Sequence, residues 1–135
     1  SATDRAERDH VDVPDPQSAE TFARSKLDWT ELARPPHAEL LAWYRELIAL
    51  RHARPELSDP RLSAVAVTYD EQARWLVVTR GKLRVVANLG GSTQSVPLGG
   101  RVKELCTASD GHARVAGSTA ALGPQSVAII DVAEV

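Results

Sequence analysis

The side chains best suited to covalent chemistry are a cysteine, an aspartate and a histidine in the last third of the chain: Cys106, Asp110 and His112. A thiol nucleophile needs a base close in space, and a Cys–His pair supplies one. Cys106, however, ends the strand-like run of residues 102–106, where a lone cysteine is usually a small buried hydrophobe. We therefore interpret Cys106 as structural and assign no catalytic residue.

Near the N-terminus, Asp9, His10, Asp12 and Asp15 offer oxygen and imidazole ligands. Their spacing matches neither a calcium loop nor a zinc pattern, so solvated loop charge is the favoured interpretation. Cys106 is the single cysteine of the sequence and has no partner for an internal disulfide. We expect no metal site and no bound cofactor.

Polar residues between positions 15 and 28 are of the types that hydrogen-bond sugar hydroxyls. They are Asp15, Gln17, Arg24, Lys26 and Asp28. Trp29 and Trp75 each offer a flat ring that a glucose unit can stack on. The same polar types also cap helices, pair charges and form turns, and the aromatic share is only 4%. A sugar-binding role for these residues stays open at this point.

The overall charge excludes some partners. The 135 residues carry a formal net charge of −2, which gives no electrostatic footprint for nucleic acid. Residues 1–10 contain no apolar run of the kind found in signal or membrane-spanning segments. We expect a cytoplasmic protein that binds neither nucleic acid nor membranes. The basic residues Arg80, Lys82 and Arg84 suggest a solubilising sheet edge that blocks strand addition.

One long helix is the most distinct element, expected over residues 36–53. Large apolar residues recur there at three- and four-residue spacing, which is typical of one helical face. They are Leu40, Trp43, Tyr44, Leu47 and Ile48. Leu41 and Leu50 widen this stripe, so the helix is expected to contact two surfaces. Residues 1–36 are polar and rich in proline, with an expected helical turn over 18–24 that presents Phe22 to a neighbour.

From residue 58 onward the pattern becomes β, with short runs rich in Val, Leu and Thr between turn residues. The candidate strands are Leu62–Tyr69, Arg74–Arg80, Leu83–Asn88, Thr93–Leu98, Val102–Thr107, Ala113–Val115 and Ser126–Val132. Residues 80–82 predict a tight hairpin, and the imperfect alternation of 83–88 suggests a strand buried on both faces. The expected fold class is mainly β, an antiparallel sandwich or an open barrel.

Three stretches resemble the α-amylase superfamily, glycoside hydrolase family 13. The helix LLAWYRELIALR (40–51), closed by RPEL (54–57), resembles the last helix of that family's catalytic barrel. The strands RWLVV (74–78) and LRVVANL (83–89) are similar to paired strands of its C-terminal β domain. The segments VPDPQ (13–17) and TFARSKLDW (21–29) resemble, more narrowly, a subgroup that releases trehalose from maltooligosyl-trehalose.

The resemblance implies the C-terminal portion of a retaining hydrolase, in which residues 1–57 are the end of the barrel and 58–135 the C-terminal β domain. Family members use one carboxylate as nucleophile and another as general acid/base. The family carries these on earlier barrel strands, and none of those motifs occurs in this sequence. We therefore expect a structural role for this chain, which would be inactive alone. Its partner would be the barrel of the same enzyme, which would bring the α-glucan.

Two other functions remain open. One is a non-catalytic carbohydrate-binding module, which two exposed coplanar aromatic rings on one sheet face would favour. The other is an interaction module, which an exposed apolar helix stripe without a sugar site would favour. A second copy of the chain could be its partner through that helix face.

Overall fold

The computed structural model describes residues 13–133, and the chain divides into two compact units between Ala38 and Glu39. The described part of the first unit contains the helix α1 (Ala19–Arg24) and the 3-10 helix η1 (Trp29–Ala33). The second unit contains nearly all of the helix α2 (His37–Ala53) and every strand. No helix in the described part of the chain is long and apolar enough to cross a membrane.

The short helices of the first unit are fixed by local caps. Ser18 Oγ accepts a hydrogen bond from the Glu20 amide at 3.2 Å and caps α1. Asp28 caps η1 by accepting from the Thr30 amide at 2.9 Å. Neither helix contains a buried residue. The helical turn expected over 18–24 is confirmed, whereas η1 has no apolar periodicity and was not expected.

The helix α2 matches the expected range of 36–53, with its first residue one position later. Glu39 lies in its first turn, and Arg51 and His52 lie in its last, where each charge suits the helix dipole. After Arg54, Pro55 opens the 3-10 helix η2 (Pro55–Leu57), because proline cannot continue an α-helix. A further 3-10 helix, η3 (Leu62–Ala64), leads into the first strand.

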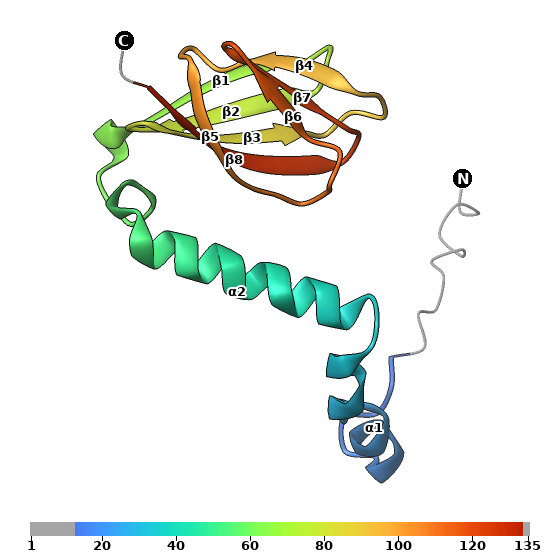
Figure 1. Cartoon of the computed structure of the whole chain (residues 1–135). Helices are drawn as coiled ribbons and strands as arrows, with labels where there is room; N and C mark the ends of the chain where they lie inside the picture. Colours follow the sequence, from blue (N-terminus) through green and yellow to red (C-terminus); the bar gives the residue numbers. More distant parts are fainter. Residues whose placement is uncertain (1–12, 134–135) are drawn as a thin grey trace, which may run out of the picture. The chain divides into compact units, whose positions relative to one another are not determined.

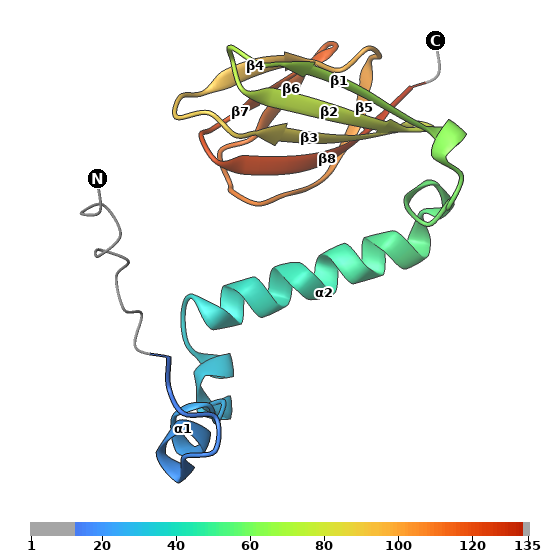
Figure 2. The ribbon, with the colours of Figure 1, turned by 180° about the vertical axis from the view of Figure 1, so that it is seen from behind.

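Eight described strands form two antiparallel sheets (Figure 1, Figure 2). The larger sheet has the order β1-β2-β3-β8-β5, and the smaller one the order β4-β7-β6. The strands are β1 (Val65–Asp70), β2 (Trp75–Arg80), β3 (Leu83–Asn88), β4 (Gln94–Pro97), β5 (Val102–Ala108), β6 (Arg114–Ala116), β7 (Thr119–Leu122) and β8 (Ser126–Val132). The mainly β fold class and the sandwich alternative are confirmed.

Two differences from the expected strands have local causes. Residues 62–64 form η3 rather than strand, so β1 begins at Val65. The strand β7 was missed because two of the four residues of Thr119–Leu122 are alanine, which carries little β preference. The hairpin expected at 80–82 is confirmed, and its turn uses Gly81 at a φ of +56°, a conformation that glycine adopts without strain.

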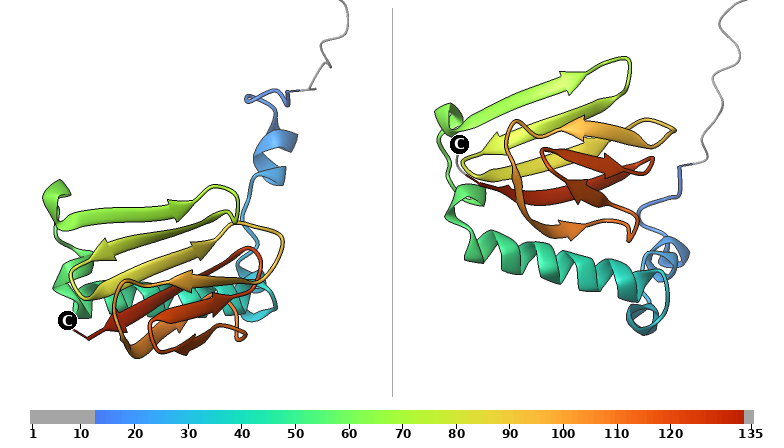
Figure 3. Two further views of the ribbon diagram at one scale, coloured as in Figure 1. Left: turned by 90° about the horizontal axis from the view of Figure 1, so that it is seen from above. Right: turned by 45° about the horizontal axis from the view of Figure 1, so that its top comes forward.

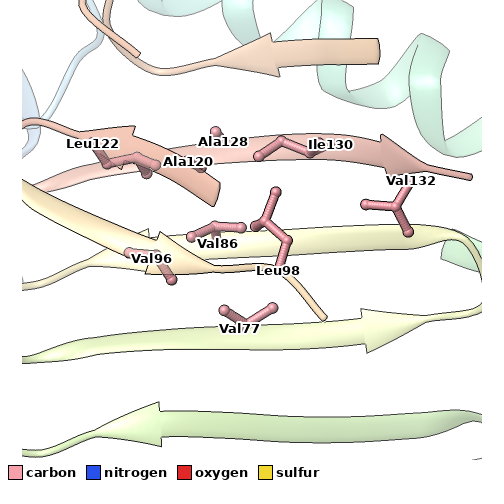
Figure 4. Packing of buried hydrophobic residues seen from close by; sticks show 9 residues of the cluster. All are labelled: Val77, Val86, Val96, Leu98, Ala120, Leu122, Ala128, Ile130 and Val132. Carbon is pink, nitrogen blue, oxygen red and sulfur yellow. The ribbon is translucent and has the colours of Figure 1, made fainter. Parts of the chain in front are cut away.

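The main core lies between the two sheets (Figure 4). Val77, Val86 and Ile130 of the larger sheet are 0–1% exposed, and Val96 and Leu122 of the smaller sheet are fully buried against them. Strand β1 contributes no residue to this cluster. The core is therefore concentrated over the strands β2, β3 and β8, and the β1 edge of the larger sheet lies outside it.

The opposite face of the larger sheet is also covered near β3 and β8. Leu83 and Asp131 are register partners, as are Val85 and Ile129, and alternation places these side chains away from the inter-sheet core. Leu83 is fully buried all the same, and Ile129 is 8% exposed. The part of α2 in the second unit runs along the side of the sandwich where β8 and β5 lie (Figure 3). The strand 83–88 is therefore largely buried on both faces, as its sequence indicated.

The sequence suggested that the basic residues around the hairpin form a solubilising sheet edge, and the structure corrects this for two of them. Arg80 and Arg84 lie on neighbouring strands inside the sheet order, not on an edge, and Arg84 is only 9% exposed. Arg80 donates from Nε to the Glu56 carbonyl at 2.7 Å and from Nη2 to the Asp59 carbonyl. Arg80 therefore holds the segment between α2 and β1 onto the sheet, and Arg84 holds the loop after β4. Both can do so because strand pairing places them inside the sheet order.

Candidate functional site

A buried ion pair fixes the C-terminal end of α2 to the sheet. Arg54 Nη2 donates to Asp131 Oδ2 at 2.9 Å, and Asp131 is 4% exposed. The hydrogen bond to Asp131 raises the pKa of Arg54, and Glu56 Oε1 lies 3.7 Å from the same Nη2. Asp131 Oδ1 is buried and has no hydrogen-bond partner among residues 13–133, so Arg54 is the cation that offsets the burial of this carboxylate.

Cys106 lies next to this ion pair. Burial raises the pKa of its thiol, which is affected in turn by the charges of Arg54, Glu104 and Asp131. The side chain of His112 is 88% exposed and lies 4.0 Å from Asp110 Oδ1, while the Asp110 carboxylate accepts from the His112 amide at 2.8 Å. The aspartate and the histidine thus form a local turn. A protonated, partly buried thiol matches the structural interpretation of this cysteine.

The helix α2 has two apolar faces that differ in exposure. Trp43, Leu47 and Leu50 are half-buried, and the Trp43 Nε1 atom is buried with no hydrogen-bond partner in the described part of the chain. Leu40, Tyr44 and Ile48 lie on the other, more exposed face of the helix, and their exposed fractions are 51%, 56% and 55%. We call these last three residues the outer ridge. Their spacing of four places them along one line of the helix surface.

The polar residues expected to contact sugar are engaged in local structure. Asp15 Oδ1 accepts from the Gln17 amide at 2.9 Å, and Arg24 lies 3.8 Å from Glu20. Lys26 Nζ lies 5.0 Å from the centre of the Phe22 ring. The cap formed by Asp28 lowers the pKa of its carboxyl group, because the Thr30 hydroxyl and amide both donate to it.

Of these residues, Asp28 lines a small hollow of about 150 Å3 in the first unit. It is lined by Leu27, Asp28, Trp29, Glu31, Leu32 and His37. Trp29 is 71% exposed, and His37 Nε2 lies 3.7 Å from Glu31 Oε2. An exposed indole ring beside carboxylate and imidazole groups is chemically able to contact a sugar, so the sugar-binding hypothesis for this segment stays a prediction.

The aromatic residues of the larger sheet do not lie on one face. Trp75 packs against the inter-sheet core, whereas Tyr69 is 65% exposed. Trp75 pairs with Asp70 and Tyr69 pairs with Leu76, so the two rings point to opposite faces. The third ring, Trp43, lies on α2 and is half-buried.

A larger hollow opens on the inner face of the larger sheet, and sequence reasoning did not identify it. Its volume is about 310 Å3, and it is lined by Thr68, Trp75, Thr79 and Arg84 with residues 97–99. We call it the inter-sheet hollow. The signal that could have revealed it is alternation, since Arg84 shares the inner face of β3 with the buried Val86 and Asn88.

Metal ligands do not cluster in the described range 13–133, where no group of three or more His, Cys, Asp or Glu residues is close enough to hold an ion. Asp9, His10 and Asp12 lie outside the described residues. Asp15, the fourth member of that set, is described and serves as a turn acceptor for Gln17.

The class of protein follows from the β sandwich together with the preceding helix. A family model described as a domain of unknown function, DUF3459, matches residues 60–129. The chain therefore belongs to the DUF3459 family. A structure of a putative α-amylase from Salmonella typhimurium aligns with a TM-score of 0.66 and 28% identity, over 88% of this chain and 20% of that one. A mutant of MutB, from crystals soaked with trehalulose, aligns with a TM-score of 0.56 and 27% identity, over 67% of this chain and 17% of that one.

More particular relatives are malto-oligosyltrehalose trehalohydrolases. The one from Mycobacterium tuberculosis is 48% identical over 91 residues, which are 67% of this chain and 16% of the relative. The one from Rhizobium sp. is 43% identical over 118 residues, which are 87% of this chain and 20% of the relative. The chain thus spans only about a sixth to a fifth of these relatives. The resemblance to the C-terminal part of such amylase-type enzymes is confirmed.

Proposed function

We propose that this chain forms the C-terminal part of an enzyme that releases trehalose from maltooligosyl-trehalose, and that its role there is structural. In this proposal residues 1–57 complete the catalytic barrel, and residues 58–135 form the accessory β domain. The names of the relatives support the reaction, and the small share of their length that this chain spans supports the division of labour.

The observation that carries the structural role is the unequal burial of the two faces of α2. One face is half-buried and leads to the Arg54–Asp131 ion pair, which joins the helix to the sheet. The outer ridge has about half of each side chain exposed. A helix with apolar residues on two faces buries both when it lies between two bodies.

Burying the outer ridge against a partner would stabilise the complex. Fully burying a Leu, Ile or aromatic side chain stabilises a protein by about 1.5–3 kcal/mol. Each of the three side chains of the outer ridge is about half exposed, so about half of that stabilisation would come only from burial against a partner. Covering the ridge would therefore contribute on the order of 2–4 kcal/mol to docking, before the costs of association.

The test uses two polypeptides. The full chain is produced with its outer ridge intact, and the catalytic portion of the Rhizobium relative is produced without the segment that matches this chain. We expect the two to associate in analytical ultracentrifugation and to release trehalose from maltooligosyl-trehalose only when mixed. Trehalose release by this chain by itself would overturn the division of labour.

A matched pair of variants on adjacent helix positions tests the surface. Ile48→Glu places a charge on the outer ridge, and Ala49→Glu places the same charge on an exposed neighbour outside it. We expect the first to abolish association and the second to leave it intact, since burying an unpaired carboxylate is costly. Equal association of both variants would show that the ridge is not the contact surface.

A further inference from the structure

The strand β1 is an open edge of the larger sheet. It pairs with β2 along its whole length, and in the described part of the chain no strand pairs with its other side. Figure 3 shows β1, in light green, at the margin of the sandwich in both views. Residues 66–70 are all exposed, and no hydrogen bond within residues 13–133 reaches the strand from its open side. The backbone groups on that side can therefore pair with another strand.

The other edges of the two described sheets carry features that hinder strand addition. The strand β5 has register shifts between Val102 and Glu104 and between Leu105 and Thr107, and such irregular strands are poor templates for pairing. In the smaller sheet, β4 ends in Pro97 and β6 is only three residues long. The strand β1 has six residues, with no proline, no lysine and no register shift. It is therefore the edge best suited to pairing with another strand.

The outer face of β1 carries a row of apolar side chains. Thr68 is the register partner of the core residue Val77, so alternation places Val67 and Tyr69 on the face away from the inter-sheet core. Val67 is 53% exposed and Tyr69 is 65% exposed, while Val65, on the same face, is half-buried. Apolar side chains thus follow the open edge on one face of the sheet.

We propose that the β1 edge binds the β1 edge of a second copy of this chain, in an antiparallel pair with its twofold axis at Val67. Antiparallel pairing around this axis places Val67 opposite Val67 of the second copy, and Val65 opposite Tyr69 of the second copy. Directly opposed residues lie on the same face of a sheet, so the apolar rows of the two copies form one continuous row. Asp70, the charged residue of the strand, then faces Ala64 of the second copy, and no like charges meet.

The pattern of β1 also selects this register. A slip by one residue would bring the apolar row of one copy onto the face of Thr68 in the other, because side chains alternate with a period of two. An axis at Thr68 would keep the faces matched but would place Val65 opposite Glu71 of the second copy. Only the axis at Val67 matches apolar residues along the whole row. The partner that this edge fits is therefore another copy of itself.

Sedimentation equilibrium of the full chain over a concentration series tests the dimer. We expect a dimer that dissociates on dilution, because a single pair of short strands buries less area than a standard interface. Val67→Lys places two like charges opposite each other at the axis and should weaken dimerisation by about tenfold or more. Leu89→Lys is the matched control, since Leu89 is 52% exposed and lies after β3, away from the edge. It should dimerise as the original chain does.

A second measurement tests the register through disulfide formation, with Cys106→Ala removing the native thiol. Val67→Cys should cross-link two copies under mild oxidation, because opposed Cα atoms lie about 4.5–5.5 Å apart, within disulfide range. Thr68→Cys should not, because each residue 68 is then opposite residue 66 and the two cysteines lie about 7–8 Å apart on a diagonal. Cross-linking of Thr68→Cys in preference to Val67→Cys would overturn the proposed pairing.

The outer ridge is the competing surface for self-association, and Ile48→Glu separates the two. We expect Ile48→Glu to dimerise through β1 as the original chain does. A dimer that Ile48→Glu dissociates and Val67→Lys leaves intact would assign the contact to the outer ridge and overturn the proposal. A monomer at every concentration, or equal weakening by Val67→Lys and Leu89→Lys, would also overturn it. These measurements need no catalytic barrel, so their failure is distinct from failure of the proposed function.

Discussion

The β sandwich and the helix α2 use their large apolar residues in opposite ways. In the sandwich, Val86, Leu122 and Ile130 are fully enclosed between two sheets that the chain itself supplies. On α2, the outer ridge is about half exposed, and Phe22 and Trp29 of the first unit are more exposed still. The same residue types are thus structural core in one region and available contact surface in the other.

This difference shows where the chain is self-sufficient. A domain is stabilised by apolar area that it encloses, and the sandwich encloses its own. An extended apolar ridge on a helix gains that stabilisation only from another body. We therefore expect the stability of the sandwich to depend on its core and on the Arg54–Asp131 ion pair, and very little on the outer ridge.

The largest effect is expected from a matched pair of isoleucine truncations. Ile130→Ala removes a fully buried side chain and should lower the free energy of unfolding by about 2–5 kcal/mol. Ile48→Ala should change it by less than about 0.5 kcal/mol, because the side chain is half exposed and alanine favours helix. Urea unfolding followed by circular dichroism measures both. Similar losses would show that the ridge is part of the core of this chain.

A somewhat smaller loss of stability is expected when the Arg54–Asp131 ion pair, which joins the end of α2 to the sheet, is removed. Arg54→Ala leaves Asp131 buried and without its cation, which should cost about 3 kcal/mol. Arg51→Ala removes an exposed arginine three residues earlier and should be nearly neutral. If Arg54→Ala is as mild as Arg51→Ala in the same urea experiment, the ion pair does not hold the helix to the sheet.

The smallest effect on stability is expected in the segment that joins helix and sheet. Hydrogen bonds from Arg61 lower the pKa of Asp59 to about 2. A lowered folded pKa stabilises the protein above the unfolded value near 3.8, and this contribution is lost as the pH falls toward about 2. Arg61 is exposed, so the gain in stability should be slight.

The measurement for this segment is an NMR titration of the Asp59 carboxyl carbon. We expect a midpoint near 2 in the original chain and a shift toward 3.8 in Arg61→Ala, with little change in urea stability at neutral pH. An unchanged midpoint would mean that the pair is not formed in solution.

Much of the fold could be predicted because it depends on local patterns. The helix of residues 36–53 followed from apolar spacing and from the proline after it, and β2, β3 and β8 followed from runs of branched residues. The alanine-rich strand β7 could not be predicted in this way, because its place in the smaller sheet comes from pairing with β4 and β6. The β preference of these residues is weak, so pairing with the neighbouring strands determines that they form a strand.

The candidate sites depended more heavily on tertiary structure. Although the structural role of Cys106 stays a prediction, its partial burial was predicted correctly, since hydrophobic strand context already indicates burial. Arg84 was not, because in sequence it is one of three basic residues around a turn, and only pairing of β3 between β2 and β8 shows that it is buried.

The sequence by itself determined the amphipathic helix, the β character of residues 65–132 and the resemblance to amylase-type C-terminal parts. Periodicity and local motifs depend only on residues that are close together in the sequence. Only the tertiary structure decided which apolar face of α2 meets the sheet, which residues remain exposed as the outer ridge, and that Arg84 lies at the inter-sheet hollow. Burial is a property of how distant strands and helices pack together, and spacing along the chain does not specify it.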